Sequence, residues 1–558
     1  MASKHQLEGE VSERRGEHSH STLQRAPVAV LLAVLTIALL AVTNPNIGLT
    51  WDEPAYMAAA ESYVGWFRLL FSRPGIALRP DAIEQYWQVN HEHPPLDKVW
   101  SGLVWFAARS VVGDLTAHRL GNMIFAGGAV ATLYLLVAGE AGQGAGLAAA
   151  GALLTMPRFF FHAHLSALDV PGAAGMLATL AAFWWTRERK DLRADLWVGL
   201  AWGLAMGLKI NAIAAPIILL LWTLLTRRQL YLFRRLAVMG ALGSLIFLIS
   251  WPWLYDQFLP RLIEYVLFIT VDHWEIGQYC LGRCYMPPPW YFGSMIVLAV
   301  VPLALSLAAI VGTAWSLRTR EIRPFATLLG LGLLVPILLP LIGNSMVYDN
   351  ERLFMPVFPC IAALAGLGFD RTRRWMGGLL RRLGARRFGD RGLSTAVPAF
   401  LVAAAFAPHV LAAGSLYPHL LSSYAASVGG LRGAARLGFE TTYWCETYAA
   451  ALPYLNAHAQ PGDTVWVEPW SHDVLLYYQA HGQLDPRLRI SRLPEAHSFF
   501  FGYGLETVDV TLEEADYTII QYRQTRFEAY EIVDYMRGRT PAYRLSHRGI
   551  PLLDIYAQ

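Results

Sequence analysis

Long apolar segments separated by short charged connections dominate the chain up to residue 413. A helix needs about 20 apolar residues to cross the roughly 30 Å hydrocarbon layer of a bilayer. By this measure the pattern predicts eleven membrane-spanning helices, over residues 26–44, 119–138, 143–161, 168–186, 195–209, 210–226, 235–253, 290–316, 324–343, 353–369 and 393–413. The polar tail before them, residues 1–25, carries no small-residue cleavage motif, so we expect the first span to be retained.

One further apolar stretch, Val99–Val112, is shorter and follows two prolines. Its placement depends on the four connections richest in Lys and Arg, which are residues 187–193, 227–235, 318–323 and 371–391. Such connections favour the cytoplasmic side of a plasma (inner) membrane. Eleven spans and a cytoplasmic N-terminus place all four there, whereas a crossing at Val99–Val112 would turn all four outward. We therefore expect a helix that lies in the membrane interface.

The same topology places the loop 44–118 and the region 414–558 outside the cytoplasm. In this C-terminal region short apolar runs, residues 464–467 and 517–520, alternate with turn signals and with the helical stretch 473–480. This pattern predicts a small α/β domain, long enough to bury its own core. The predicted fold class is thus an α-helical polytopic membrane protein, residues 26–413, with an extracytoplasmic α/β domain.

Composition agrees with a membrane protein and excludes other classes. Hydrophobic residues make up 55% of the chain and charged residues 16%, against about 25% charged in soluble domains. The net charge of +3 is too small to indicate a nucleic-acid partner. Four cysteines are too few for a disulfide scaffold. Cys280 and Cys284 lie in an outer loop and leave a single disulfide open.

Two adjacent acids, Asp52 and Glu53, follow the first span directly. A carboxylate at this position suits a general base. The alternative is structural, because Thr50 and Glu53 have capping-box spacing and acids favour the start of a helix. Spacing alone leaves both interpretations open.

Basic residues and histidines gather at the same outer face. Lys98 and Arg119 lie where the phosphate of a lipid would be, although single cations at an interface are usually snorkelling anchors. His91 and His93 suggest a metal, but a His-x-His pair without further ligands is weak evidence for one. A polar turn before two prolines is the favoured interpretation there.

Four more polar residues interrupt or end apolar segments. Asp169 lies at the outer end of a predicted span, where an ionisable group is costly and a functional role is the default hypothesis. An N-cap is the alternative, because Pro171 follows closely. Lys209 and Asn211 are the strongly polar residues of their apolar run. Arg352 stands at an outer span boundary, as a phosphate partner or an anchor.

Together these residues resemble a known arrangement. The motifs are Asp52-Glu53, His93-Pro94-Pro95-Leu96-x-Lys98, Arg119, Asp169-Val170-Pro171, Gly207-x-Lys209-x-Asn211, Arg352-Leu353-Phe354-Met355-Pro356 and Gly438-Phe439-Glu440-x-x-Tyr443-Trp444. In this order they are similar to the GT-C superfamily of glycosyltransferases. The closest branch is the dolichyl-phosphate-mannose protein mannosyltransferases and their bacterial relatives, including the aminoarabinose transferases that modify lipid A. The resemblance extends over nearly the whole chain.

The resemblance implies transfer of a sugar from a polyprenyl-phosphate donor to a protein, glycolipid or polysaccharide acceptor outside the cytoplasm. It implies that Asp52 is the base and Glu53 its support. Single displacement then implies inversion at the anomeric carbon. The implied phosphate ligands are Lys98, Arg119, Arg352 and His93, supported by Asp169, Lys209 and Asn211. A divalent metal held by Asp52 and Asp169 is left open as the one cofactor.

The chain departs from the pattern of the protein mannosyltransferases at two places, and a transporter is the competing function. Asp97 stands where the protein mannosyltransferases have a small residue, and the tail lacks the β-trefoil insert of the eukaryotic enzymes. A transporter or lipid flippase with an outer sensing domain would share the span count. It would be expected to show paired halves with interrupted helices at matching positions, whereas this chain gathers its polar residues at one face.

Overall fold

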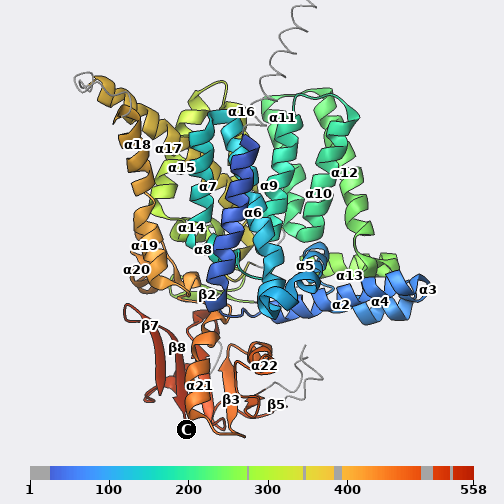
Figure 1. The fold of residues 1–558 in the computed structure, drawn as a ribbon, viewed down its shortest axis with the longest axis vertical. Coiled ribbons are helices and arrows are strands. Elements are labelled where there is room, and N and C mark those ends of the chain that lie inside the picture. The colour runs from blue at the N-terminus through green and yellow to red at the C-terminus, as the bar shows by residue number, and fades with distance from the viewer. Residues whose placement is uncertain (1–24, 273–275, 343–346, 383–392, 492–506, 528–531) are drawn as a thin grey trace, which may run out of the picture.

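The computed structural model describes residues 25–272, 276–342, 347–382, 393–491, 507–527 and 532–558. It contains a large helical unit and, at one end of it, a smaller unit built around a sheet (Figure 1). Of the predicted N-terminal tail, residues 1–25, all but Arg25 lies outside the described residues.

Each predicted span overlaps a helix of the large unit. These helices are Arg25–Asn46, α6 (Asp114–Ala141), α7 (Gln143–Leu154), α8 (Pro157–His162), α9 (Asp169–Thr186), α10 (Leu192–Leu208), α11 (Ala214–Thr226), α12 (Leu230–Ile249), α14 (Phe292–Val300), α15 (Leu303–Arg318), α16 (Arg323–Leu338), α17 (Val357–Arg382), α18 (Leu393–Ala404) and α19 (Ala407–Leu416). By length and composition, five helices of the described chain could span a membrane, or six if the pair α14 and α15, bent by 115°, counts as one. The number of spans stays a prediction.

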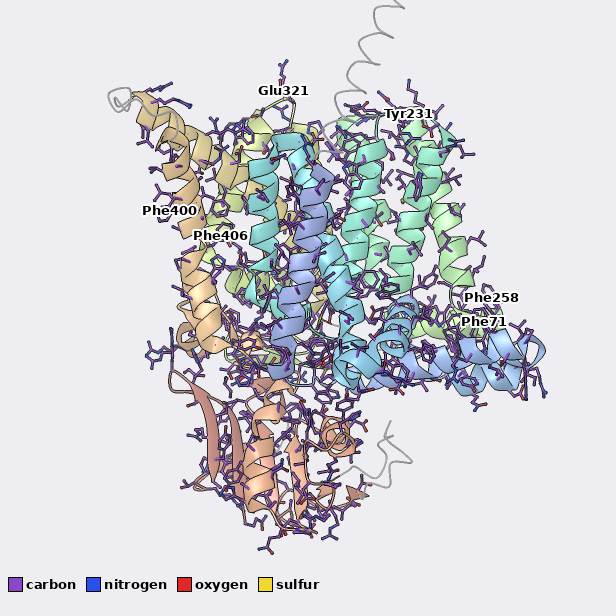
Figure 2. All side chains as sticks on the ribbon, viewed as in Figure 1. Phe71, Tyr231, Phe258, Glu321, Phe400 and Phe406 are labelled. Carbon is purple, nitrogen blue, oxygen red and sulfur yellow. The ribbon has the colours of Figure 1, made fainter. Side chains whose placement is uncertain are left out.

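The outer surface of this unit is apolar, as a lipid environment requires. Large side chains such as Leu230, Trp197 and Phe400 are mostly exposed there, and Figure 2 shows Phe400 on the outside of the bundle. Inside, small residues let backbones approach. A Cβ on Gly368 of α17 would lie 1.8 Å from the carbonyl oxygen of Ala308 on α15. The chain is a multi-pass membrane protein.

The two ends of the helical unit differ. At the end beside the sheet, Figure 1 shows helices that run across the direction of the bundle helices. This group contains α2 (Glu53–Ser72), α3 (Pro74–Ala77), α4 (Pro80–Trp87), α5 (Leu96–Val112) and α13 (Phe258–Thr270). The helix predicted over Val99–Val112 is part of α5. At the opposite end Figure 2 labels Tyr231 and Glu321, which belong to the connections 227–235 and 318–323. These two connections therefore share one end, as the expected topology requires; residues 383–391 of the connection 371–391 lie outside the described residues.

The C-terminal unit contains a six-stranded sheet in the order β5-β4-β3-β6-β8-β7. The strands are β3 (Thr464–Glu468), β4 (Arg489–Ser491), β5 (Thr507–Val508), β6 (Tyr517–Gln521), β7 (Tyr543–His547) and β8 (Ile550–Ala557). The first four are parallel, and β8 pairs antiparallel with both β6 and β7. The helices around it are α20 (Gly430–Arg436), α21 (Leu452–His458), α22 (His472–Ala480), α23 (Gln524–Phe527) and α24 (Ile532–Met536). Both predicted strands and the predicted helix 473–480 are confirmed.

The direction of the strands matters for the site. The chain ends on β8 at the far tip of the sheet (Figure 1). Because β6 is antiparallel to β8 and parallel to β3, the carboxyl ends of β3 and β6 face the helical unit. Segments that follow these strands can therefore reach the membrane-embedded part.

Cys280 and Cys284 lie on a short hairpin of β1 (Gln278–Cys280) and β2 (Arg283–Tyr285). Both are free thiols. The structure thus does not show the disulfide that the sequence left open.

Candidate active site

The adjacent acids Asp52 and Glu53 point to different partners. Glu53 Oε2 accepts hydrogen bonds from the amide and the hydroxyl of Thr50, at 2.9 and 3.1 Å. The N-cap of α2 is Asp52 and not Thr50, so the predicted capping box does not form, although Glu53 does bond back to the chain before the helix. Asp52 precedes α2 but makes no side-chain cap. Its carboxylate is 30% exposed and turns toward Arg352 instead. Only Asp52 faces the open part of the site.

Glu53 and Arg119 form a closed ion pair. Nε and Nη2 of Arg119 donate to the two oxygens of Glu53, each at 2.7 Å, and both side chains are fully buried. The remaining guanidinium donors bond three oxygens of the chain before α2, and the amide of Ser166 donates to Glu53 at 2.9 Å. A guanidinium has five N–H donors, and here all are engaged. The structure therefore places the predicted phosphate ligand Arg119 away from the open site.

Arg352 lies at the centre of the polar cluster, on a short 3-10 turn, η5 (Arg352–Phe354). Its Nη2 is 2.7 Å from Oδ2 of Asp52, its Nε 3.3 Å from Oδ2 of Asp169 and its Nη1 2.5 Å from Oδ2 of Asp349. The guanidinium carbon lies 3.6 Å from the ring centroid of Trp444, within cation–π range. Three carboxylates and an aromatic face thus fix the position of this one cation.

Asp52 has the environment of a base. Burial raises the pKa of Asp52 more than the neighbouring Arg352 lowers it, so the carboxylate binds a proton more readily than in water. Oδ2 receives Arg352 and, at 3.4 Å, the Tyr56 hydroxyl. Among the described residues no donor bonds Oδ1. That oxygen is available to a hydroxyl group from outside.

Lys209 and Asn211 support the cluster from the other side. Helix α10 ends at Leu208, and the extended backbone of Lys209 leads into the 3-10 turn η2 (Ile210–Ile213). Lys209 Nζ lies 2.5 Å from Oδ1 of Asp169. Gly172 on α9 permits this approach, because a Cβ there would be 2.7 Å from the Lys209 Cβ. Asn211 donates to the carbonyl of Leu353 at 3.1 Å. The three predicted supporting residues therefore meet beside Arg352.

Lys98 lies at the start of α5 and bonds to a neighbouring loop, not to the Arg352 cluster. Its Nζ donates to the carbonyl oxygen of Asn90 at 2.5 Å, to the side chain of Asn90 at 2.9 Å and to the carbonyl of His93 at 3.0 Å. Burial lowers the pKa of Lys98 to about 7 and raises that of Asp97 to about 8. His93 packs edge-on against Tyr56, 5.9 Å between ring centroids. Asp169 pairs with Lys209 and Arg352 and not with Lys98.

Beneath the cluster lies a buried network to which the sequence analysis gave no role. Glu351 receives Arg158 Nη1 at 3.2 Å and the Tyr443 hydroxyl at 2.9 Å, and it lies 3.5 Å from His162 Nε2. His162 Nδ1 in turn lies 3.8 Å from Asp169. Arg158 could have been recognised from the sequence, because it is a charged residue inside a predicted span, where a functional role is the default hypothesis. This network fixes the residue that precedes Arg352.

The C-terminal unit contributes directly to the site. Arg523, just after β6, donates to Oδ1 of Asp349 at 2.7 Å, so Asp349 bridges Arg523 and Arg352. Four non-glycine residues at this junction, Asp349, Asn350, Trp444 and Cys445, have φ between 55° and 71°. Backbone strain of this kind persists where surrounding contacts enforce it and concentrates at functional sites.

An open pocket of about 570 Å³ adjoins the loop that holds Lys98. It lies between α13 and the turn that contains His91 and Glu92, with Ile263, Leu267 and Phe268 among its apolar lining residues. The pocket therefore has a polar end near Lys98 and an apolar wall, as an amphipathic ligand would need.

Comparison with known proteins identifies this arrangement. Residues 95–255 match the sequence profile of the family described as dolichyl-phosphate-mannose-protein mannosyltransferase. The crystal structure of ArnT from Cupriavidus metallidurans in the apo state superposes with a TM-score of 0.53 at 18% identity, over 95% of this chain and 98% of that one. The chain has the GT-C glycosyltransferase fold. The resemblance to the PMT and ArnT branch of GT-C proteins is thereby confirmed.

Two further GT-C structures carry lipid phosphates. ArnT bound to undecaprenyl phosphate superposes with a TM-score of 0.51 at 19% identity, covering 94% of this chain and 97% of that one. AglB from Archaeoglobus fulgidus, in complex with an inhibitory peptide and a dolichol-phosphate, gives 0.51 at 12% identity, covering 90% and 69%. No curated protein sequence matches the chain. The segment that matches the family profile includes Lys98, Asp169 and Lys209, whereas Asp52 and Arg352 flank it.

A divalent metal between Asp52 and Asp169 does not fit this geometry. The guanidinium of Arg352 bridges the two carboxylates and donates to both. A metal would have to displace that cation, which Asp349 and Trp444 also hold. We therefore derive no step through a metal at this site.

Proposed function

We propose that the chain transfers a sugar from a polyprenyl-phosphate-linked donor to an acceptor on the outer side of the membrane. The observation that carries this proposal is the meeting of one accessible carboxylate, Asp52, with the cations Arg352 and Lys209. The undecaprenyl phosphate bound by the ArnT relative supports a lipid phosphate as the donor carrier. A transporter or flippase is less well supported, because the polar cluster lies at one end of the bundle beside the C-terminal unit.

The reaction needs one base and a charge-stabilised leaving group. Oδ1 of Asp52 takes the proton of the acceptor hydroxyl while the acceptor oxygen bonds to the anomeric carbon. The bond from that carbon to the phosphate oxygen breaks, and its electron pair leaves with the polyprenyl phosphate. A phosphate is already a good leaving group, so no general acid is required, unlike the two carboxylates of a glycosidase. A single displacement inverts the anomeric carbon.

Arg352 and Lys209 are the cations we assign to the donor phosphate. Both pair with the carboxylate of Asp169, which therefore holds the two cations close together. A phosphate that binds beside this carboxylate could interact with both cations. Lys98 can join them only by leaving its three oxygen partners in the loop 90–93. We propose that it instead shapes that loop, with His93, at the mouth of the pocket next to α13, where the apolar wall takes the isoprenoid chain.

Glu53 and Arg119 have a structural role in this proposal. Their closed pair leaves no oxygen or N–H group facing the open site. They join the chain before α2 to α6, and so fix the backbone that carries Asp52.

The proposed orientation follows from the two ends of the helical unit. The connections 227–235 and 318–323, rich in Lys and Arg, share the end opposite the C-terminal unit, and such connections are retained in the cytoplasm. The active site and the C-terminal α/β domain, residues 414–558, then face the outside of the plasma (inner) membrane.

The test is transfer by membranes supplied with polyprenyl-phosphate sugars and with protein, glycolipid or polysaccharide acceptors. Asp52→Asn should reduce the transfer rate by a factor on the order of 10² to 10⁴, the usual contribution of a general base. Asp81→Asn is the matched control, because its carboxylate lies on the same outer loop but is 68% exposed and pairs with Arg79. Unchanged transfer by Asp52→Asn would remove Asp52 as the base.

A further inference from the structure

A second cluster of metal-ligating side chains lies apart from Arg352, where α2, α6 and the end of α22 meet. Glu61 of α2 and Asp114 and His118 of α6 each offer one ligand atom, and these atoms all lie within 4.8 Å of one another. His481, the residue after α22, adds Nε2 at 3.3 Å from Oδ2 of Asp114. The four side chains thus come from the helical unit and the C-terminal domain.

The sequence spacing explains the arrangement. Asp114 and His118 are four residues apart and therefore lie on one face at the start of α6. His118 is fully buried, and the ring of Trp105 stacks on it with 5.0 Å between centroids. Glu61, with its side chain 42% exposed, leaves the cluster open to solvent on one side.

One contact in the cluster needs a positive charge between its atoms. Nδ1 of His481 lies 2.9 Å from the carbonyl oxygen of Tyr477; since a carbonyl only accepts, Nδ1 carries the hydrogen. In neutral His481 the lone pair of Nε2 then faces the carboxylate of Asp114, at 3.3 Å. His118 Nε2 lies 3.3 Å from Glu61, and its buried Nδ1 has no hydrogen-bond partner among the described residues. A proton or a metal cation at His481 would balance the contact with Asp114.

The hydrogen bonds around the cluster are those that orient metal ligands. Asp114 accepts Trp105 Nε1 at 2.7 Å and the Tyr477 hydroxyl at 2.9 Å. His481 bonds a backbone carbonyl through its second nitrogen. Ligating carboxylates and histidines are typically held by such outer partners, which fix the tautomer and the orientation of the ring.

We propose that Glu61, Asp114 and His118, with His481 as the fourth ligand, bind a divalent transition-metal ion. Imidazole and carboxylate ligands are among those that bind Zn²⁺. Zinc bonds of about 2.0–2.1 Å place tetrahedral ligand atoms about 3.3–3.4 Å apart, which the two 3.3 Å contacts already match. The ion fastens the C-terminal domain to the interface helices α2 and α6. It lies outside the Asp52 cluster and does not depend on the transferase proposal.

The experiment measures bound metal in the full chain, purified in detergent or nanodiscs, equilibrated with Zn²⁺ and freed of loosely bound ion by gel filtration. Elemental analysis should find one more equivalent of zinc in the wild type than in Glu61→Gln, Asp114→Asn or His118→Ala. His118→Ala should weaken zinc binding roughly 100-fold or more, since even outer-sphere changes cost 10 to 100-fold. Histidines elsewhere contribute equally to all variants.

His458→Ala is the matched control. His458 makes the same Nδ1 contact with the carbonyl of Tyr454, at 2.8 Å, and stacks on that ring, but no described carboxylate pairs with it. This variant should keep the extra zinc equivalent, and added zinc should raise the melting temperature of the wild type and of His458→Ala alone.

Two outcomes would overturn the proposal. One is a wild type that retains no stoichiometric metal. The other is Glu61→Gln and Asp114→Asn variants that bind zinc as tightly as the wild type. Glu61→Gln keeps the test valid if the buried variants fail to fold, because the Glu61 side chain is partly exposed.

Discussion

Substitution of Glu53 by glutamine separates the two roles of the adjacent acids. The change removes one negative charge and keeps the size of the side chain. Arg119 would then stay buried without a counter-ion, because Glu53 is the carboxylate that pairs with it in the described structure. One of its five donors would also lose its acceptor, since Arg119 donates to both oxygens of Glu53 and glutamine offers a single oxygen. Breaking a buried ion pair by removing one partner costs about 3–5 kcal/mol. Asp52→Asn carries no such cost, since Asp52 is 30% exposed.

The two neighbouring substitutions are expected to affect different properties, namely the stability of the protein and the rate of transfer. Glu53→Gln should lower the thermal stability and the yield of folded protein, whereas transfer per folded molecule stays within a few-fold of the wild type. Asp52→Asn should show the opposite pattern. The assay combines size-exclusion chromatography of heated samples in detergent with transfer rates normalised to the folded fraction. A stable Glu53→Gln variant that lacks transfer would refute the structural assignment and restore Glu53 to the chemistry.

Three more outcomes are expected. Because Asp52 must be deprotonated and burial raises its pKa above 3.8, kcat/KM should fall as the pH drops through that raised pKa; a rate that stays constant down to pH 4 would contradict this. In Arg523→Gln the carboxylate of Asp349 loses its second cation and attracts Arg352 more strongly. Arg352 is then less available to the donor phosphate, so the donor KM should rise several-fold. Arg544→Gln, in an ion pair of the same domain, should leave KM unchanged, and equal effects would exclude the specific coupling. A cysteine at Arg381 should resist a membrane-impermeant reagent applied from outside, and ready labelling there would reverse the orientation.

The sequence predicted the parts of the fold that depend on local pattern. Apolar runs located a helix for every expected span, and alternation with turn signals located β3, β6 and α22. The loop 44–118 was harder, because α2 and α4 carry mixed faces that resemble ordinary amphipathic surface. That two of its residues, Glu61 and Asp114, approach His481 depends on docking of the C-terminal domain, which no local pattern encodes.

For the site, the sequence identified residue types but not partners. It brought Asp52, Lys98, Arg119, Asp169 and Arg352 to one face by topology. The structure places Asp52, Asp169 and Arg352 together, whereas Lys98 and Arg119 have other partners. The sequence could not distinguish Glu53 from Asp52, because the difference arises from Arg119, which is 66 residues away in the chain. Contacts with residues that are distant in the sequence decide which carboxylate is buried in an ion pair and which stays accessible.

The position of Arg352 shows why the C-terminal domain belongs to the catalytic unit in the proposed function. A guanidinium that holds a lipid phosphate must be fixed before the donor arrives, since positioning it in the complex would cost binding energy. Asp349 supplies one anchor, and that acid is itself held by Arg523 after β6. Trp444 supplies the other, by covering the face of the guanidinium. Because the carboxyl ends of the parallel strands face the helical unit, Arg523 reaches the site over a short connection, and the geometry of the sheet becomes part of the geometry of phosphate binding.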